Sequence, residues 1–263
     1  METNEKYAVV LAAGKGTRMK SELPKVLMEV ADKPMILHVL DNLLPLNLKQ
    51  IVFVVGYKKD LVIDTVQDYI SRNYEYFFDK ISFVEQKEQL GTGHAFLMAE
   101  SILSNKKGYV LVTAGDMPFI QTKSFYQLFE IVNNKQSAGA VLGSVLENPT
   151  GYGRLVRDPR NLLEKIVEEK DATEDIKKIK EVNTGCYVFK LPEIFSILKE
   201  IKNNNNQNEY YLPDVVEIYR KKNQIFSDFI LKDYREALGA NTKEELEQLN
   251  FIYHLLFASE KKY

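Results

Sequence analysis

Short apolar runs alternate with amphipathic segments through the first half of the chain. The run QIVFVV at 50–55 is continuously apolar after its first residue and is followed by a glycine, the pattern of a strand buried on both faces of a sheet. Between such runs, apolar residues recur at the three- and four-residue spacing typical of a helix with one buried face. The pattern predicts strands at 7–11, 50–55, 81–84 and 109–113, and helices at 34–44, 59–70 and 92–103, the last capped by Thr92.

This order of elements predicts an α/β fold. Strands separated by helices need crossover connections, which favour a mostly parallel central sheet flanked by helices on both faces. In sheets of this kind, ligands bind beyond the carboxyl ends of the strands. Gly14 and Asp116 each follow a predicted strand. We therefore expect both residues to face one crevice.

The second half of the chain is richer in strands. The pattern predicts strands at 138–146, 153–156, 162–167 and 182–189, as an insertion or an extended sheet that covers one side of the crevice. A polar asparagine run at 201–207 predicts a loop. No internal repeat or second folded domain is evident.

A terminal helix is expected at 242–262. Its apolar residues form a stripe that favours packing against the body of the protein over binding a partner. The stripe consists of Leu246, Leu249, Tyr253, Leu256 and Phe257.

Composition and charge argue against several classes of protein. The chain has 263 residues and a formal net charge of −2, so no global basic field favours nucleic acid as a partner. The single cysteine, Cys186, excludes an internal disulfide and a zinc site built from several cysteines. No apolar stretch reaches the roughly 20 residues of a membrane helix, and the N-terminus is unlike a signal peptide. We expect a cytoplasmic protein without a membrane partner.

A glycine-rich loop with three basic residues follows the first predicted strand. Gly14 and Gly16 allow a sharp bend that brings backbone N–H groups close to an anion, and Lys15, Arg18 and Lys25 add positive charge. This composition is suited to a polyphosphate. The loop matches neither the ATPase sequence G-x-x-x-x-G-K-[ST] nor the dinucleotide sequence G-x-G-x-x-G. The alternative is a surface turn with solvated charges.

Other polar residues follow predicted strands further along the chain. Asp116 offers a hard oxygen ligand to Mg²⁺, although an aspartate there could equally cap a turn. Gln86 precedes a turn through Gly91, where free amides at a helix start could read a base or a ribose. Glu168 and Asn183 offer hydrogen-bonding groups suited to sugar hydroxyls, and each is only a moderate signal alone.

Taken in order, these blocks resemble one family. The segments LAAGKGTRM, LPKVL, EQLGTGHA, GDMP, NPTGYGR, IVEEKDA, VNTG, NEYYLPD and GAN are similar to the uridyltransferase domain of bacterial N-acetylglucosamine-1-phosphate uridyltransferase. The resemblance covers almost the whole chain. It implies a Rossmann-like nucleotide-diphospho-sugar transferase fold, with a strand-rich second half that binds the sugar. It also implies a nucleotidyltransferase domain at 1–241, followed by the helix at 242–263.

The resemblance also implies roles for individual residues. Arg18 and Lys25 would be catalytic, and Asp116 and Asn241 would hold Mg²⁺. The implied nucleotide contacts are Leu11, Ala12, Ala13, Gly14, Lys25, Gln86, Gly91 and Thr92, and the implied sugar contacts are Gly153, Glu168 and Asn183. Two departures from the family are Ala114, where a tyrosine is frequent, and Pro213, where threonine or serine is more usual.

The expected reaction converts UTP and N-acetylglucosamine 1-phosphate to the UDP-sugar and pyrophosphate. Three alternatives stay open: a related transferase for another hexose 1-phosphate, a glycosyltransferase that uses a UDP-sugar, and a non-catalytic nucleotide-sugar-binding protein. Proteins of this family carry a C-terminal β-helix that acetylates glucosamine 1-phosphate and builds a trimer. We expect this chain to lack the β-helix and to be a monomer or a dimer.

Overall fold

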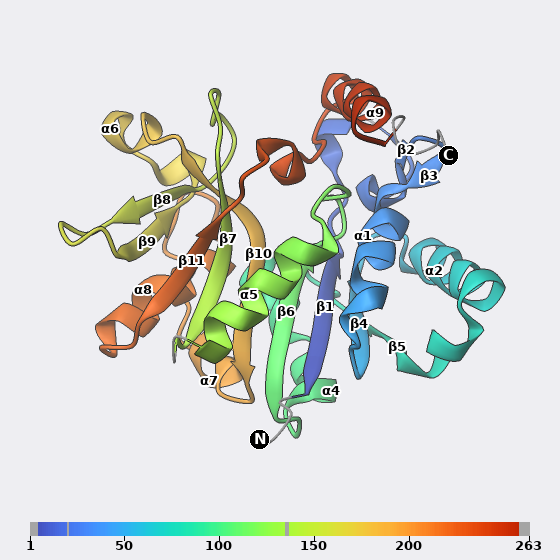
Figure 1. The fold of residues 1–263 in the computed structure, drawn as a ribbon, viewed down its shortest axis with the longest axis horizontal. Coiled ribbons are helices and arrows are strands. Elements are labelled where there is room, and N and C mark those ends of the chain that lie inside the picture. The colour runs from blue at the N-terminus through green and yellow to red at the C-terminus, as the bar shows by residue number, and fades with distance from the viewer. Residues whose placement is uncertain (1–4, 20, 135–136, 258–263) are drawn as a thin grey trace.

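The computed structural model describes residues 5–19, 21–134 and 137–257, and one large sheet forms its centre (Figure 1). The principal strands are β1 (Lys6–Ala12), β4 (Gln50–Val55), β5 (Ile81–Glu85), β6 (Gly108–Ala114), β7 (Gly139–Val145), β10 (Glu181–Leu191) and β11 (Phe226–Ile230). They lie in the order β11-β7-β10-β6-β1-β4-β5.

Most neighbouring strands in this order run parallel. β1 pairs in parallel with both β4 and β6, β4 pairs in parallel with β5, and β11 pairs in parallel with β7. β10 is the exception, because it lies antiparallel between β6 and β7. The predicted mostly parallel sheet is confirmed. The carboxyl ends of β1, β4, β5 and β6 therefore meet at one edge.

Helices cover both faces of the sheet (Figure 1). Successive side chains of β1 point to opposite faces, so Ala8 and Val10 join one core while Tyr7 and Val9 join the other. The first core is completed by α1 (Met35–Leu43), α2 (Lys59–Asn73) and α5 (Thr122–Asn134). The second core receives side chains from α3 (Thr92–Leu97), α4 (Glu100–Leu103), α7 (Ile194–Leu198) and α8 (Val215–Lys221).

The smaller elements lie beside this framework. β8 (Arg154–Arg157) and β9 (Leu163–Val167) form an antiparallel pair that joins the sheet through β10. β2 (Glu29–Val30) and β3 (Lys33–Pro34) form a separate two-stranded sheet, and α6 (Glu174–Lys177) follows β9. The asparagine run at 201–207 is a loop, as predicted.

The C-terminal helix α9 (Lys243–Phe257) packs against the body of the protein. Leu249 is buried in a small core with Val30, Met35 and Phe119, and Leu246 and Tyr253 pack at its edge. This confirms the expected docking face for these three residues of the stripe. The side chains of Leu256 and Phe257, like residues 258–263, lie outside the described part of the chain.

One predicted helix differs from the structure. The segment at 92–103 forms two helices, α3 and α4, separated by Met98 and Ala99. The predicted cap is also wrong, because Gly91 precedes the helix and no side-chain cap is formed there. The Thr92 hydroxyl instead accepts a hydrogen bond from the backbone N–H of Leu212, 3.0 Å away. A partner 120 residues distant has replaced the local cap.

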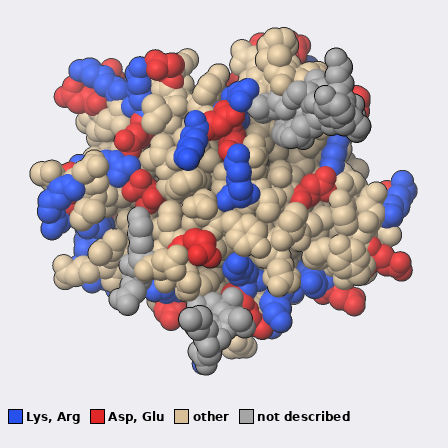
Figure 2. Space-filling model, in the orientation of Figure 1, with Lys and Arg blue, Asp and Glu red and all other residues tan. Residues whose placement is uncertain are grey.

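Charged side chains of both signs are interspersed on the face shown in Figure 2. This distribution agrees with the small formal net charge of −2. In the described ranges, no helix is both long enough and apolar enough to cross a membrane.

Candidate active site

A cavity of about 390 Å³ opens at the carboxyl ends of β1 and β6. Its volume lies within the range of small-molecule binding sites. The predicted nucleotide, catalytic and metal residues all line it. They are Leu11, Ala12, Ala13, Gly14, Arg18, Lys25, Gln86, Gly91, Thr92, Asp116 and Asn241. The expectation that Gly14 and Asp116 face one crevice is confirmed.

The glycine-rich loop owes its path to Gly16. This residue has a φ of +65°, and a Cβ placed there would lie 2.5 Å from Cβ of Lys25. A side chain at position 16 would therefore displace the lysine. The buried Met19 fixes the loop from below, and its N–H donates to the Gly16 carbonyl at 3.0 Å. By contrast, a Cβ on Gly14 meets nothing within 4 Å.

Four polar side chains converge at one side of the cavity. The Lys25 ammonium forms an ion pair with the Asp116 carboxylate and donates to Asn241 Oδ1 at 2.7 Å. The Arg18 guanidinium donates to the same Asn241 oxygen at 3.0 Å. Two cationic side chains and two side chains with oxygen atoms that can bind a metal thus meet between the loop, the end of β6 and the segment before α9. This cluster suits an anionic ligand that carries its own metal ion.

The oxygen donors in this cluster fit a magnesium ion. Asp116 offers a carboxylate and Asn241 an amide carbonyl, and both already face one cationic group, the Lys25 ammonium. Mg²⁺ is usually held by one or two protein oxygens together with water and substrate phosphates. Among the described residues there is no group of three or more His, Cys, Asp or Glu side chains placed to hold a metal. A metal here would therefore depend on ligand oxygens as well.

The turn after β5 forms the opposite wall. The Gln86 side chain is buried, and its Nε2 donates to the Gly91 carbonyl at 3.1 Å and lies 3.0 Å from Nδ1 of His94. Gly91 has a φ of +107°, and a Cβ there would lie 2.7 Å from the Tyr210 carbonyl oxygen. The turn can therefore lie against the 209–212 segment only with glycine at position 91.

Two residues of this wall were missing from the predicted site. Gln89 lines the cavity, and its Nε2 donates to the Ala13 carbonyl at 2.9 Å. Glu209 lines the cavity from the segment that packs on Gly91. The signal for Gln89 was its place beside Gly91 in EQLGTGHA. Glu209 gives no such local signal, because its position depends on contacts between distant segments.

The three predicted sugar residues lie together, but they do not line this cavity. The Asn183 N–H donates to the Gly153 carbonyl at 2.8 Å. A Cβ on Gly153 would lie 3.1 Å from Oε1 of Glu168. The close approach of the Glu168 carboxylate explains why a glycine stands at position 153.

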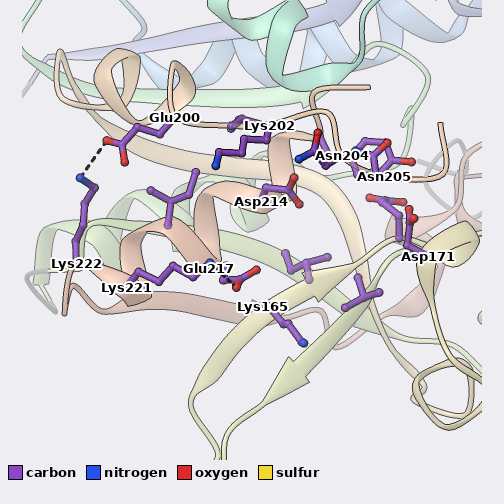
Figure 3. Close-up of a pocket in the computed structure, with 16 residues that line it drawn as sticks. Lys165, Asp171, Glu200, Lys202, Asn204, Asn205, Asp214, Glu217, Lys221 and Lys222 are labelled. Atoms are coloured by element: carbon purple, nitrogen blue, oxygen red, sulfur yellow. Dashed lines mark ion pairs between the residues drawn. The ribbon is translucent and has the colours of Figure 1, made fainter. Parts of the chain in front are cut away.

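Glu168 instead lines a second cavity of about 710 Å³ (Figure 3). This cavity lies among β9, the 200–205 loop and α8, and Glu200 pairs with Lys222 at 3.0 Å on its rim. Burial, followed by the charges of Asp214 and Asp171, raises the pKa of Glu168 to about 7. Burial, followed by Glu217, raises the pKa of Asp214 to about 6.

The smaller cavity remains the better candidate for the reacting centre. Arg18, Lys25, Asp116 and Asn241 line that cavity and not the larger one. The segment around Glu209–Tyr211 lies between the two, because Glu209 lines the smaller cavity and Tyr211 the larger. Glu168 could reach a ligand in the smaller cavity only if that ligand extended past this boundary.

Comparison with known proteins agrees with this architecture. The family described as "Nucleotidyl transferase" matches residues 7–242. The "Bifunctional protein GlmU" of Lactococcus lactis subsp. cremoris (strain SK11) is 44% identical over 243 residues, which are 92% of this chain and 51% of that protein. The "Bifunctional protein GlmU" of Listeria monocytogenes serotype 4a (strain HCC23) is 42% identical over 245 residues, 93% of this chain and 51% of that protein. The chain thus spans about half the length of these curated relatives.

A solved structure extends the comparison to the fold. The crystal structure of UDP-glucose pyrophosphorylase complexed with UDP-glucose superimposes with a TM-score of 0.76. The match covers 96% of this chain and 99% of that one, at 21% sequence identity. The two proteins share a fold, which is that of the nucleotide-diphospho-sugar transferases.

Proposed function

Since the chain belongs to the nucleotidyl transferase family, we propose that it transfers the UMP group of UTP to N-acetyl-α-D-glucosamine 1-phosphate. The products are UDP-N-acetylglucosamine and pyrophosphate. The observation that carries this proposal is the convergence of Arg18, Lys25, Asp116 and Asn241 at one side of the cavity. The motif resemblance and the curated relatives support the choice of reaction within the family.

The chemistry requires two anions to meet. A phosphate oxygen of the sugar phosphate attacks the α-phosphorus of UTP, a new P–O bond forms, and the bond to the leaving pyrophosphate breaks. Arg18 and Lys25 lower the barrier by stabilising the negative charge that develops on the leaving group. No general base is needed, because the sugar phosphate is already an ionised nucleophile. Asp116 and Asn241 would hold a magnesium ion, which would supply further charge neutralisation at the phosphates.

The rest of the cavity suits a uridine nucleotide. The exposed backbone around Gly14 allows close approach of phosphates, since a Cβ there meets no protein atom within 4 Å. Gln86 Oε1 can accept from the imide N–H of uracil, while its Nε2 is held by the Gly91 carbonyl. The Thr92 hydroxyl accepts from Leu212 and can still donate its own proton to the nucleotide.

We assign sugar recognition to Gly153, Glu168 and Asn183. Glu168 and Asn183 present acceptors and donors suited to hydroxyl and amide groups. The side-chain Oδ1 of Asn183 already accepts from the Gly185 N–H at 2.9 Å, which leaves the Nδ2 group of Asn183 to donate to the sugar. The sugar would then lie toward the second cavity.

A second candidate substrate is another hexose 1-phosphate, glucose 1-phosphate in particular. It is favoured by the fold shared with a UDP-glucose pyrophosphorylase over 96% of this chain. A non-catalytic protein that binds a nucleotide sugar is the third reading, and it does not explain why Arg18 and Lys25 converge on the proposed metal ligands.

A pyrophosphate-release assay tests these readings together. UTP, ATP, CTP and GTP are each combined with N-acetylglucosamine 1-phosphate, N-acetylgalactosamine 1-phosphate and glucose 1-phosphate, with Mg²⁺ or with excess EDTA. We expect the highest kcat/KM for UTP with N-acetylglucosamine 1-phosphate, and no release in EDTA. A preference for glucose 1-phosphate would move the proposal to the second candidate. Binding of UDP-sugar without any release of pyrophosphate would leave the non-catalytic role and the glycosyltransferase that uses a UDP-sugar.

A further inference from the structure

Asn241 joins Arg18 and Lys25 through a single oxygen atom. Its Oδ1 accepts from both cations, at 3.0 and 2.7 Å. The residue lies on the short segment between the 3₁₀ helix Tyr234–Ala237 and α9, outside the central sheet. The geometry of the cluster therefore depends on what holds this segment in place.

The first turn of α9 holds Asn241 by its backbone. The Asn241 N–H donates to Oε2 of Glu245 at 2.5 Å. Glu245 is in turn fixed at the helix start, since its own N–H donates to the Thr242 hydroxyl at 3.2 Å. In a capping box, a threonine hydroxyl accepts from the backbone N–H of a glutamate three residues later, and the glutamate carboxylate accepts from the backbone N–H of the threonine. Here the Glu245 carboxylate instead accepts from the N–H of Asn241, one residue before Thr242. Asn241 is the residue whose side-chain amide contacts Arg18 and Lys25.

The helix that carries Glu245 is itself anchored on the body. Leu249 is 2% exposed in the core below α9. Asn250 Oδ1 accepts from the Ala31 N–H at 2.8 Å, which ties α9 to the turn between β2 and β3. Because these contacts hold α9 in place, Glu245 can restrain Asn241.

A close contact at Gly239 fixes the position of the same segment relative to Asp116. A Cβ placed on Gly239 would lie 2.8 Å from Sδ of Met117 and 3.0 Å from the Asp116 carbonyl oxygen. The chain two residues before Asn241 therefore runs directly along the backbone of the other proposed metal ligand. Between these two restraints, the amide of Asn241 has little freedom to move away from the cluster.

We propose that Glu245 is a positioning residue that fixes Asn241 toward Asp116 and Lys25, and so sets the affinity of the site for a divalent cation. The inference rests on the proposed function for the role of Asn241. Partners that orient a metal ligand without touching the metal commonly change metal affinity or activity by about 10- to 100-fold. Glu245 would act in this way through the backbone of the ligand.

Two other roles for Glu245 predict different behaviour. A carboxylate that only caps α9 would change stability and leave the metal dependence unchanged. A carboxylate that acts only by its negative charge near the site would lose its effect in a glutamine variant. Positioning needs only an oxygen acceptor, so glutamine should preserve it, since its Oε1 can accept the same N–H.

The test compares Glu245→Ala, Glu245→Gln and the control Glu247→Ala, which removes the same charge from an exposed position on the same helix. The first readout is pyrophosphate release at saturating UTP and sugar phosphate over a series of Mg²⁺ concentrations. The second needs no turnover: the enhancement of water proton relaxation by Mn²⁺ with protein and UTP, against UTP alone. Thermal unfolding of each variant measures its stability separately.

We expect Glu245→Ala to raise the Mg²⁺ concentration for half-maximal rate by about tenfold, with a smaller change in kcat, and to weaken the Mn²⁺ enhancement. Glu245→Gln and Glu247→Ala should stay close to the wild type. An active wild type with Glu245→Ala equal to Glu247→Ala in both readouts would overturn the positioning role, as would an equal loss in Glu245→Gln. A wild type that releases no pyrophosphate would overturn the proposed function, and the Mn²⁺ readout alone would then decide the role of Glu245. Absence of any Mn²⁺ enhancement in the wild type would overturn the role as well.

Discussion

Lys25 Nζ lies 2.7 Å from Asn241 Oδ1, although 216 positions separate the two residues in the sequence. The same ammonium pairs with Asp116 at the end of β6. Three distant parts of the chain therefore meet at one point of the cavity. Because a neutral ligand would gain little from such a concentration of charge, the arrangement favours a phosphate-bearing ligand with its metal.

Replacing Arg18 or Lys25 should impair turnover far more than folding. Loss of one preorganised charge-stabilising donor costs about 100-fold or more in kcat. Arg18 is exposed, so Arg18→Ala should change the unfolding temperature little. The measurement is steady-state pyrophosphate release beside thermal unfolding for both alanine variants.

Arg72→Ala is the matched control, because it removes an arginine that is 73% exposed on α2 and pairs with Asp68 on the same helix. It should retain wild-type kcat. Near-normal turnover in Arg18→Ala would contradict the catalytic role of the loop.

Alanine at Gly16 and alanine at Gly14 should have different consequences. In Gly16→Ala, the alanine must adopt the left-handed φ of Gly16, and its Cβ would lie 2.5 Å from Cβ of Lys25. The substitution should therefore lower both stability and kcat. Gly14→Ala meets no protein atom within 4 Å, so it should keep stability and weaken UTP binding only. Thermal unfolding and UTP titration calorimetry measure the two effects. Equal destabilisation by the two substitutions would show that the loop conformation, and not ligand approach, requires glycine at position 14.

Glu168 should make the stability of the protein fall with rising pH. Burial and the nearby carboxylates raise its pKa to about 7 from an ordinary value of 4.5. Between these values the folded protein keeps a proton that the unfolded chain has released, so the free energy of unfolding decreases as the pH rises. The penalty is complete above pH 7. Glu168→Gln removes it, so the variant should gain most over the wild type above pH 7, and the difference should shrink toward pH 4.5.

Unfolding temperatures of both proteins from pH 4.5 to 8 measure this difference. Glu164→Gln, at an exposed position of β9, is the control for loss of a carboxylate from the same strand. A stability difference that is constant with pH would contradict the raised pKa of Glu168.

Substitution of Leu249 tests whether α9 belongs to the folded body. Leu249→Ala removes a side chain that is 2% exposed, and such changes cost about 2–5 kcal/mol of unfolding free energy. Leu255→Ala on the same helix, at 60% exposure, should stay within about 0.5 kcal/mol. Denaturant unfolding measures both. A small effect of Leu249→Ala would mean that α9 contributes little to the stability of the domain.

The parallel part of the sheet could be predicted from the sequence because its strands are buried on both faces. In runs such as Gln50–Val55 every residue after the first is apolar and buried, and few other structures bury so many consecutive residues. α5, α8 and β11 were not predicted. β11 is a short strand at the edge of the sheet, and its sequence, FSDFI at Phe226–Ile230, shows neither a continuous apolar run nor a strict alternation of apolar and polar residues. Its pairing with β7 is a tertiary contact.

The residues of the candidate site also fall into two groups: those with a local sequence signal, and those whose position depends on contacts between distant segments. Gly14, Arg18 and Asp116 carry local signals, since each follows a predicted strand. The position of Asn241 followed only from the resemblance, because nothing near it in the sequence indicates Lys25 as its partner. Thr92 shows the limit most clearly: its hydroxyl serves Leu212 instead of its own helix, and local capping rules contain no information about a residue 120 positions away.

The most direct test of the proposed reaction follows the α-phosphorus of UTP. The purified protein is incubated with UTP labelled at the α-phosphorus, N-acetylglucosamine 1-phosphate and Mg²⁺, and labelled UDP-N-acetylglucosamine and released pyrophosphate are both quantified. We predict equal amounts of the two products, and loss of both in Arg18→Ala and in excess EDTA. Label that stays in UTP while the protein binds nucleotide and metal, or labelled UMP without a UDP-sugar, would contradict nucleotidyl transfer to this sugar phosphate.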